Sequence, residues 1–385
     1  MNPNVARVTP SLIRAINALK RPGDIDLGLG EPTLPPDLDA FEAALEWTHQ
    51  HGSPYTANAG FPELREVVAR YVSGDAELAG GPIGRDNVCI TVGSEEAIFL
   101  AIKTVVDPAR HEVLIPEPCF LAYPKICTLE GIRYRTVPMS ADDGFRPSAA
   151  ALLDALGPDT RLIVLNSPCN PTGRVWPSDE LEALARGLAE HRTGDGEPVF
   201  VLSDEVYREL HYGDSPPASI AWYHPETLVA GSLSKSNALT GLRLGWLAGP
   251  ASVIADAIKV HQFVDVAAST FAQRVALHLF SQPGRLAAHR PAYVAARERL
   301  LAGAAAAGIE IIPPEGTFYA LVRLPPRHRA DSLSAARTIL EETRVVTVPG
   351  RAFGDSAEGW LRVSWVAPPD ALEEGIRRIG EWFQR

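Results

Sequence analysis

The chain has 385 residues, of which 46% are hydrophobic and 22% are charged, and its formal net charge is −11. This length and composition allow a large buried core and indicate about two domains. The negative charge and the lack of clustered Lys and Arg argue against a nucleic-acid or anionic-membrane partner, so the sequence favours small-molecule chemistry. The long apolar run of a signal peptide or membrane span is also missing, which predicts a cytoplasmic location.

The four cysteines are widely spaced and form no C-x-x-C pair, which predicts reduced thiols instead of a disulfide framework or a zinc site. His49 and His51 form an H-x-H motif, but no cysteine or acidic cluster accompanies them. We therefore predict that the protein has no metal site.

Six short apolar runs, several of them rich in Val and Ile, are typical of buried strands. They span residues 87–92, 112–116, 161–166, 198–204, 227–234 and 242–249. Helical patterns lie between most of them, such as 94–106 and 178–191, the latter with Ser178 as its expected N-cap. Strands that alternate with helices predict an α/β fold, with a mostly parallel sheet flanked by helices.

The pattern changes after about residue 285. A long Ala/Arg/Leu helix over 284–308 is followed by strand-like runs at 318–324 and 360–366 and by a closing helix. These elements indicate a smaller α+β domain. We expect three parts: an N-terminal arm that contributes to the small domain (1–45), a large domain (46–284) and the small C-terminal domain (285–385).

Ligands of open α/β sheets lie outside the carboxyl ends of the strands, so the residues after each strand are the first place to seek chemistry. After the first run, the turn Gly93-Ser94-Glu95 opens a helix whose free N–H groups and dipole can bind an anion. A plain strand-to-helix turn is the alternative. After the third run, two prolines and a glycine fix the backbone around Asn170, which indicates an aimed side-chain amide. A tight turn without function is the alternative there.

Asp204 ends the run 198–204. A strand buried on both faces makes an isolated carboxylate costly unless a cation meets it. Tyr207 follows three residues later and can point into the same space. A helix-capping aspartate is the alternative interpretation.

The stretch "GSLSKSNALTGLRLGW" contains Lys235, one of only five lysines in the chain. Its neighbours Ser232, Ser234 and Arg243 can together clamp a phosphate. A lysine held near cationic or apolar groups loses its proton more readily and becomes a nucleophile toward aldehydes. The sequence has no P-loop, and "GLGEP" at 28–32 lacks the rest of a dinucleotide fingerprint, so we discount NAD.

One ligand matches these four sites: an aldehyde that carries a phosphate, a ring nitrogen that needs an acid, and a ring hydroxyl that needs an amide and a phenol. That ligand is pyridoxal 5′-phosphate. The order and spacing of the motifs, over nearly the whole chain, resemble the class I/II pyridoxal-phosphate-dependent aminotransferases of the aspartate aminotransferase fold, fold type I. The resemblance implies an enzyme that moves an amino group between an L-amino acid and a 2-oxo acid.

The resemblance also implies a role for each residue. Lys235 would be the Schiff-base lysine and Asp204 the partner of the ring nitrogen. Asn170 and Tyr207 would bind the ring hydroxyl, and Phe120 would stack on the ring. The implied phosphate ligands are Ser232, Ser234, Arg243 and the turn Gly93-Ser94-Glu95.

Further matches lie outside the sheet. Gly30 in "LGLGEP" resembles the substrate-side loop, and Arg362 in "WLRVSW" resembles the arginine that grips the α-carboxylate of the substrate. Tyr55 resembles the tyrosine that reaches the cofactor phosphate of the neighbouring subunit, which implies a homodimer. The chain departs from the family at Asn237, where Phe or Tyr is usual.

Two other functions stay open at this point. A β-lyase or another pyridoxal-phosphate enzyme of the same fold would share these motifs, because they report the carbanion and not its fate. A non-catalytic pyridoxal-phosphate-binding regulator would normally need an attached DNA-binding module, and the sequence shows no basic helix-turn-helix.

The amino donor is predicted from Glu95, which is followed by Glu96. Some aspartate-preferring members of the family place a lysine at the position of Glu95. A glutamate there repels an acidic side chain, which predicts a preference for neutral or aromatic donors. The alternative is that Glu95 serves only the helix dipole and never meets the substrate.

Overall fold

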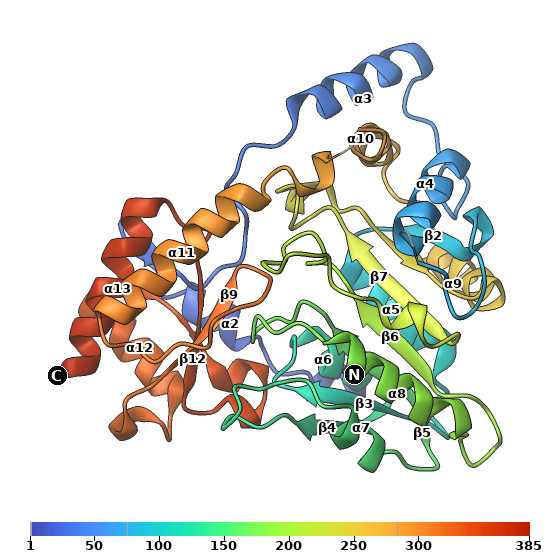
Figure 1. Ribbon diagram of the computed structural model, residues 1–385. Coiled ribbons are helices and arrows are strands. Elements are labelled where there is room, and N and C mark those ends of the chain that lie inside the picture. The colour runs from blue at the N-terminus through green and yellow to red at the C-terminus, as the bar shows by residue number, and fades with distance from the viewer. Residues whose placement is uncertain (1, 75, 283) are drawn as a thin grey trace.

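The computed structural model describes residues 2–74, 76–282 and 284–385. At its centre lies a seven-stranded sheet in the order β2-β8-β7-β6-β5-β3-β4 (Figure 1). Its strands are β2 (Val88–Thr91), β3 (Glu112–Glu117), β4 (Arg133–Pro138), β5 (Thr160–Asn166), β6 (Phe200–Asp204), β7 (Thr227–Ser232) and β8 (Gly245–Ala248). The strands from β3 to β7 pair in parallel, while β8 is antiparallel to both of its neighbours, β2 and β7. The mostly parallel α/β sheet expected from the sequence is thus confirmed.

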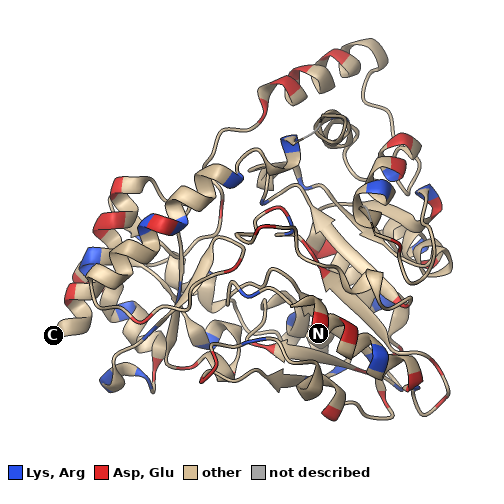
Figure 2. Cartoon of the chain, in the orientation of Figure 1, with Lys and Arg blue, Asp and Glu red and all other residues tan. Residues whose placement is uncertain are grey.

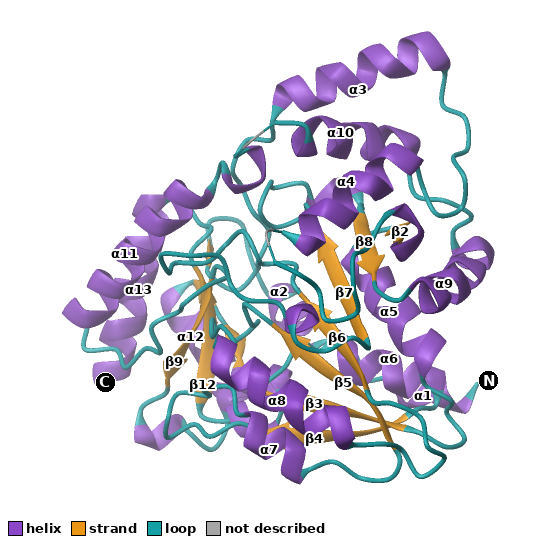
Figure 3. Cartoon of the chain, turned by 45° about the vertical axis from the view of Figure 1, so that its right-hand side comes forward, coloured by secondary structure: helices purple, strands orange, loops and turns teal. Residues whose placement is uncertain are grey.

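Apolar side chains leave both faces of this sheet, and helices cover each face (Figure 3). In β6, Phe200 and Leu202 pack on one side and Val201 packs on the other. The helices of the first side are α5 (Ser94–Val105), α6 (Ala122–Glu130) and α9 (Ala251–Val264). The helices of the second side are α7 (Ala149–Asp154) and α8 (Ser178–Glu190). Near β2 and β8, this side is covered by α4 (Pro62–Ser73) and α10 (Thr270–Phe280). Burial on both faces explains the continuous apolar runs.

The edge strand β4 was not among the strands expected from the sequence. Of its six residues, only Val137 is buried, because β4 pairs with β3 alone and its outer side faces solvent. An edge strand of this kind carries charged and polar side chains, so it lacks the apolar run by which the other strands were recognised.

Two expected helix ends differ in the structure. The prediction that Ser178 caps α8 is wrong, because the helix begins at Ser178 itself and Pro177 is its N-cap residue, without a side-chain hydrogen bond. Pro177 has an extended backbone conformation, so the helix starts only after it. Two acidic residues in the first turn stabilise the helix through their interaction with its dipole. The long helix expected over 284–308 is also divided, and α11 (Arg290–Ala306) begins next to Pro291, which has no N–H to continue a preceding helix.

A second, three-stranded sheet lies beside the first, in the order β11 (Val348–Pro349), β12 (Trp360–Ser364) and β9 (Tyr319–Arg323). The helices α11, α12 (Ser332–Thr343) and α13 (Pro369–Gln384) pack around it in one apolar cluster. Ile16 and Leu27, from the N-terminal segment, belong to the same cluster.

The N-terminal segment runs along the two sheets. It contains α1 (Pro3–Arg7), α2 (Leu12–Asn17), β1 (Ile25–Asp26) and α3 (Leu38–His51). β1 pairs in parallel with β10 (Val345–Val346), while α3 packs against α10 at the far side of the large sheet (Figure 1). The helix α3 continues across residue 45, where the sequence placed the first domain boundary. The division into three parts stays a prediction.

Lys and Arg, as well as Asp and Glu, are scattered over the helices and loops, although α3 carries acidic residues alone (Figure 2). Within the described ranges, no helix has both the length and the apolar character that crossing a bilayer requires. His51 of the H-x-H motif stacks on Trp47 and contacts the Trp47 carbonyl oxygen through Nδ1 at 2.9 Å. Local packing therefore accounts for this histidine.

Candidate active site

One edge of the large sheet gathers the turns that the sequence singled out. Asn166 at the end of β5 pairs with Asp204 at the end of β6, and Asp204 pairs with Ala230 of β7. Because β8 runs in the opposite direction, its first residue, Gly245, pairs with both Ser232 and Thr91 at the same edge. The parallel strands therefore deliver the residues after their ends, while β8 delivers the residues before its start.

A cavity of about 310 Å³ opens at this edge. The predicted residues that line it are Gly30, Ser94, Glu95, Phe120, Asn170, Asp204, Tyr207, Ser234, Lys235, Arg243 and Arg362. Gly93 and Ser232 do not line the cavity, but each lies within two residues of a serine that does, Ser94 or Ser234. Tyr55 lies elsewhere, on the loop between α3 and α4, with 86% of its surface exposed.

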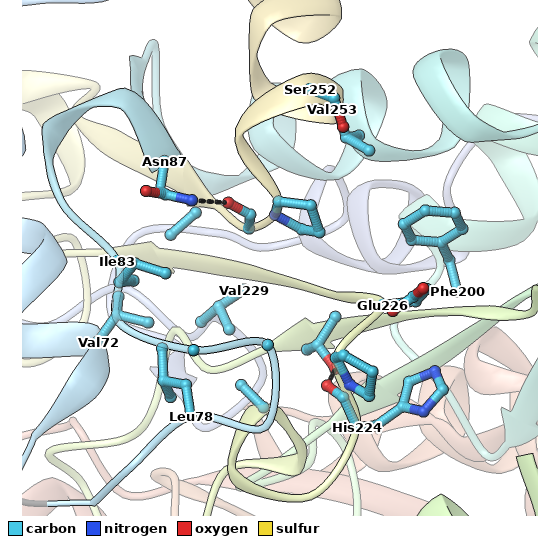
Figure 4. A pocket seen from close by; sticks show the side chains of 18 residues that line it. Val72, Leu78, Ile83, Asn87, Phe200, His224, Glu226, Val229, Ser252 and Val253 are labelled. Atoms are coloured by element: carbon cyan, nitrogen blue, oxygen red, sulfur yellow. Dashed lines mark hydrogen bonds between the residues drawn. The ribbon is translucent and has the colours of Figure 1, made fainter. Parts of the chain in front are cut away.

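A second cavity, of about 280 Å³, lies near the opposite edge of the sheet (Figure 4). Its walls include the starts of β6 and β7 and the segment that joins β8 to α9. Polar groups such as Asn87 and His224 are already bonded to main-chain oxygens of Gly249 and Val199. None of the predicted site residues lines it, so we assign the active site to the first cavity.

Asp204 is buried, with 3% of its surface exposed. Its carboxylate accepts hydrogen bonds from the Tyr123 hydroxyl at 2.6 Å and from the Val206 N–H at 3.2 Å. Burial raises the pKa of Asp204 from 3.8 to about 6, against the lowering effect of the Tyr123 hydrogen bond. The Val206 contact closes a turn, and the chain continues without an α-helix at this point. A helix-capping role therefore does not explain this carboxylate.

Lys235 reaches the cavity from the turn after β7. Its Nζ atom donates to the Gly30 carbonyl oxygen at 3.0 Å and lies 5.9 Å from the centre of the Phe318 ring. The Ser232 hydroxyl donates to the Leu244 carbonyl oxygen at 2.7 Å. Ser232 thus fastens the turn to the start of β8, and it leaves the cavity wall to its neighbour Ser234.

The turn at Gly93 is shaped for an anion. Gly93 has φ +85°, and a Cβ atom there would lie 2.5 Å from an Arg243 guanidinium nitrogen. A Cβ atom on Gly245 would lie 2.6 Å from the Gly93 carbonyl carbon and the Ser94 nitrogen. Two glycines therefore let β8, Arg243 and the N-terminus of α5 approach each other closely. The free N–H groups of α5, the helix dipole and one arginine meet at this point.

The two glutamates that follow this turn face different surroundings. Glu95 is exposed and lines the cavity. Glu96 turns away from it, because its carboxylate accepts a hydrogen bond from the Val92 N–H at 2.5 Å and lies 2.6 Å from His261 Nδ1. Only Glu95 can therefore meet a ligand in the cavity.

Arg362 reaches the cavity from β12 and is 3% exposed. Its guanidinium donates to Asn170 Oδ1 at 3.0 Å and to the Gly28 carbonyl oxygen at 2.6 Å. It lies over the Tyr319 ring, with 4.0 Å between Cζ and the ring centre. Asn170 is itself held by Asn166, whose Oδ1 accepts from the Asn170 N–H at 2.8 Å.

The comparisons with known proteins agree with this arrangement. The sequence profile of the family "Aminotransferase class I and II" matches residues 22–379. The chain belongs to the class I and II aminotransferase family. An aspartate aminotransferase of Pyrococcus horikoshii is 32% identical, over 92% of this chain and 89% of its own, and aromatic-amino-acid aminotransferase 2 of Thermococcus litoralis is 31% identical, over 97% and 95%. A solved structure of a mutant Thermus thermophilus aspartate aminotransferase superposes with a TM-score of 0.90 at 31% identity, over 99% of each chain.

This aminotransferase therefore moves an amino group between an amino acid and a 2-oxo acid, as the resemblance implied. Sequence reasoning missed several residues that line its cavity. They are Ile13, Arg14, Leu29, Ile98, Asn166, Val206, Thr240 and Tyr319. Arg14 and Tyr319 come from α2 and β9, which no motif tied to the strand ends. Tyr123, which bonds Asp204, lies in the helix after β3 and was equally without a signal.

The raised pKa of Asp204 predicts a pH dependence of the stability of the ligand-free aminotransferase. Between about pH 4 and 6, folded Asp204 holds its proton while the unfolded chain has lost it, so this contribution to stability falls as the pH rises through that window. The two pKa values imply about 3 kcal/mol. Asp204→Asn removes this titration, and urea midpoints of both proteins at pH 4, 5, 6 and 7 measure it.

We expect the stability of Asp204→Asn relative to the wild type to rise over this window and then to become constant. The exposed Asp142 supplies the control, because Asp142→Asn should leave the pH dependence of stability as it is in the wild type. A difference between wild type and Asp204→Asn that is the same at pH 4 and pH 6 would contradict the assignment.

Proposed function

We propose that this aminotransferase uses pyridoxal 5′-phosphate, bound in the cavity at the carboxyl edge of the large sheet. The observation that carries the proposal is the buried Asp204 carboxylate, which shares this cavity with Lys235. A carboxylate with a raised pKa and no cationic hydrogen-bond partner among the described residues favours a ligand that brings a positive charge. The ring nitrogen of this cofactor is such a group.

The anion site supports the same ligand. The α5 N-terminus, the Arg243 guanidinium and the Ser234 hydroxyl would hold the phosphate, with Gly93 and Gly245 leaving room for the main-chain N–H groups. Ser232 would act indirectly, because its hydroxyl is bonded to the Leu244 carbonyl oxygen and its role is to keep Ser234 in place. Asn170 and Tyr207 would bind the ring hydroxyl, and Phe120 would cover the ring.

When bound, pyridoxal phosphate supplies an aldehyde that takes up the amino group and a protonated ring that accepts electrons from the broken Cα–H bond. Asp204 stabilises the positive charge on the ring nitrogen. Lys235 would take the proton from the substrate Cα atom and deliver it to the carbon that carried the aldehyde oxygen of the cofactor. Arg362 binds the α-carboxylate, and its two bonds to Asn170 and Gly28 fix the plane of its guanidinium.

The lysine is tested by chemical trapping. Borohydride reduction of the enzyme loaded with pyridoxal phosphate should leave the label on the peptide of Lys235. Lys235→Ala should lose this label and all measurable turnover, because no other amine could hold the aldehyde or move the proton. Lys259→Ala changes a lysine whose side chain is 74% exposed and should keep both. Label on Lys20, Lys103, Lys125 or Lys259 would refute the assignment.

We also propose that the active unit is a homodimer in which Tyr55 completes the site of the neighbouring subunit. Tyr55 and Phe263 are each 86% exposed, and Val264 and Val266 are exposed as well. The Tyr55 loop lies against this segment, since Asn58 Nδ2 donates to the Val266 carbonyl oxygen at 2.7 Å and the Thr270 hydroxyl to the Pro54 carbonyl oxygen at 2.6 Å. An exposed apolar patch of this kind favours burial against a second copy.

Subunit exchange tests the shared site. Lys235→Ala and Tyr55→Ala chains are each expected to be inactive. After mixing and reassociation, each hybrid has one intact site, so the mixture should recover about a quarter of the wild-type activity. A Tyr55 that acted within its own subunit would give no recovery. A fully active monomer in sedimentation would contradict the dimer itself.

The donor is the finer part of this proposal. The relatives named above differ in their donors, so we rely on the cavity, in which Glu95 faces the ligand. Because solvent screens the exposed Glu95, its repulsion of an acidic side chain should cost on the order of 1 kcal/mol, or about fivefold in rate. We propose neutral or aromatic amino acids as the preferred donors.

The prediction is a low kcat/KM for aspartate compared with alanine, leucine, phenylalanine and methionine. Glu95→Gln should raise the value for aspartate and leave alanine nearly unchanged, because only the charge is removed. Glu96→Gln is unsuitable as a control because Glu96 bonds Val92, so the exposed Glu298→Gln serves instead. Aspartate as the best donor by tenfold or more would end this hypothesis.

A further inference from the structure

Tyr319 lines the active-site cavity, although it belongs to the small sheet and not to the large one. It is the first residue of β9 and is 3% exposed. In the antiparallel pair of β9 and β12, Tyr319 pairs with Ser364 and Leu321 pairs with Arg362. Tyr319 and Arg362 are therefore diagonal neighbours on one face of the sheet, at a separation that a large aromatic side chain spans.

The ring of Tyr319 supports the Arg362 guanidinium. The Cζ atom of Arg362 lies 4.0 Å from the centre of the Tyr319 ring, and Phe353 approaches the same group at 4.9 Å. A cation over an aromatic face is attracted to it, and the attraction grows when both are shielded from water. The ring thus fixes the side of the guanidinium that its bonds to Asn170 and Gly28 leave free.

The hydroxyl of Tyr319 meets the other half of the site. A Cβ atom on Gly30 would lie 1.5 Å from this hydroxyl, so the phenol occupies the space that a side chain at residue 30 would need. The carbonyl oxygen of Gly30 is the atom that accepts from Lys235 Nζ at 3.0 Å. Tyr207 is another neighbour of Tyr319, with the two rings nearly perpendicular and 6.0 Å between the ring centres.

These contacts converge on a single side chain. We infer that Tyr319 is a positioning residue, which holds the carboxylate-binding Arg362 by its ring and aligns Tyr207 and the Gly30–Lys235 contact by its hydroxyl. The inference rests on the proposed function. Burial, followed by the neighbouring Tyr319 phenol, raises the pKa of Tyr207, so loss of that phenol makes Tyr207 a stronger hydrogen-bond donor.

Two substitutions separate the ring from the hydroxyl. Tyr319→Leu removes the ring, and we expect KM for the amino acid to rise by about tenfold or more with a smaller change in kcat, because Arg362 loses its support. Tyr319→Phe keeps the ring and should hold KM within about twofold. In Tyr319→Phe, the pH midpoint of the visible spectrum of the bound cofactor should move to lower pH, because Tyr207 then favours the anionic ring oxygen more strongly.

Tyr212→Phe is the matched control, since the Tyr212 hydroxyl donates to the Thr317 carbonyl oxygen and Tyr212 is not part of the cavity wall. It should match the wild type in KM and in the spectral midpoint. Borohydride labelling of Lys235 in the wild type and in each variant separates the two proposals. If the wild type takes no label, the proposed function is contradicted. If the wild type and the variants are labelled, the KM and spectral results test the role of Tyr319 alone.

Either of two results overturns the inference: a KM in Tyr319→Leu within about twofold of the wild type, or an unchanged spectral midpoint in Tyr319→Phe. Urea midpoints show whether each variant is folded. If Tyr319→Leu does not fold, the spectral midpoint of Tyr319→Phe decides the question alone.

Discussion

The burial of one carboxylate, Asp204, is the constraint around which the site is organised. A charged group at the end of a strand covered on both faces is costly, and this structure offsets the cost with a phenol and a main-chain N–H instead of a cation. The pKa of the carboxylate is therefore raised, and a positive charge placed beside it would stabilise its ionised form. A positively charged ligand group beside Asp204 would bind more tightly, and the carboxylate would raise the pKa of that group so that it stays protonated.

The strand directions decide what stands around that carboxylate. The six strands that run in the same direction would alone place only the residues after each strand at the carboxyl edge. The antiparallel β8 adds the residues before its start, and Arg243 reaches the N-terminus of α5 in this way. The close contact depends on Gly93 and Gly245, because a Cβ atom on either would collide with its neighbours. The anion site is thus a property of backbone packing as much as of the arginine.

The wall of the cavity that holds Arg362 is built by a different part of the chain. Arg362 and Tyr319 come from the small sheet, and Gly28 and Gly30 come from the segment after β1, which pairs with β10. Their contacts with Asn170, Tyr207 and Lys235 join the two sheets directly at the cavity. The geometry of such a cavity is sensitive to the packing of the small sheet, even at residues that do not line the cavity.

The sequence by itself determined the mostly parallel α/β sheet, because strands buried on both faces must be continuous apolar runs. It also located the residues at the ends of those strands or just after them, such as Asp204 and Lys235. It did not reveal the edge strand β4, whose exposed side chains are polar, or the first residue of α8, where Pro177 set the boundary. Tyr123, Arg14 and Tyr319 reach the cavity from a helix, the N-terminal segment and the small sheet. Only the tertiary structure could place them, since contacts between residues far apart in the chain depend on how the elements pack and leave no local pattern.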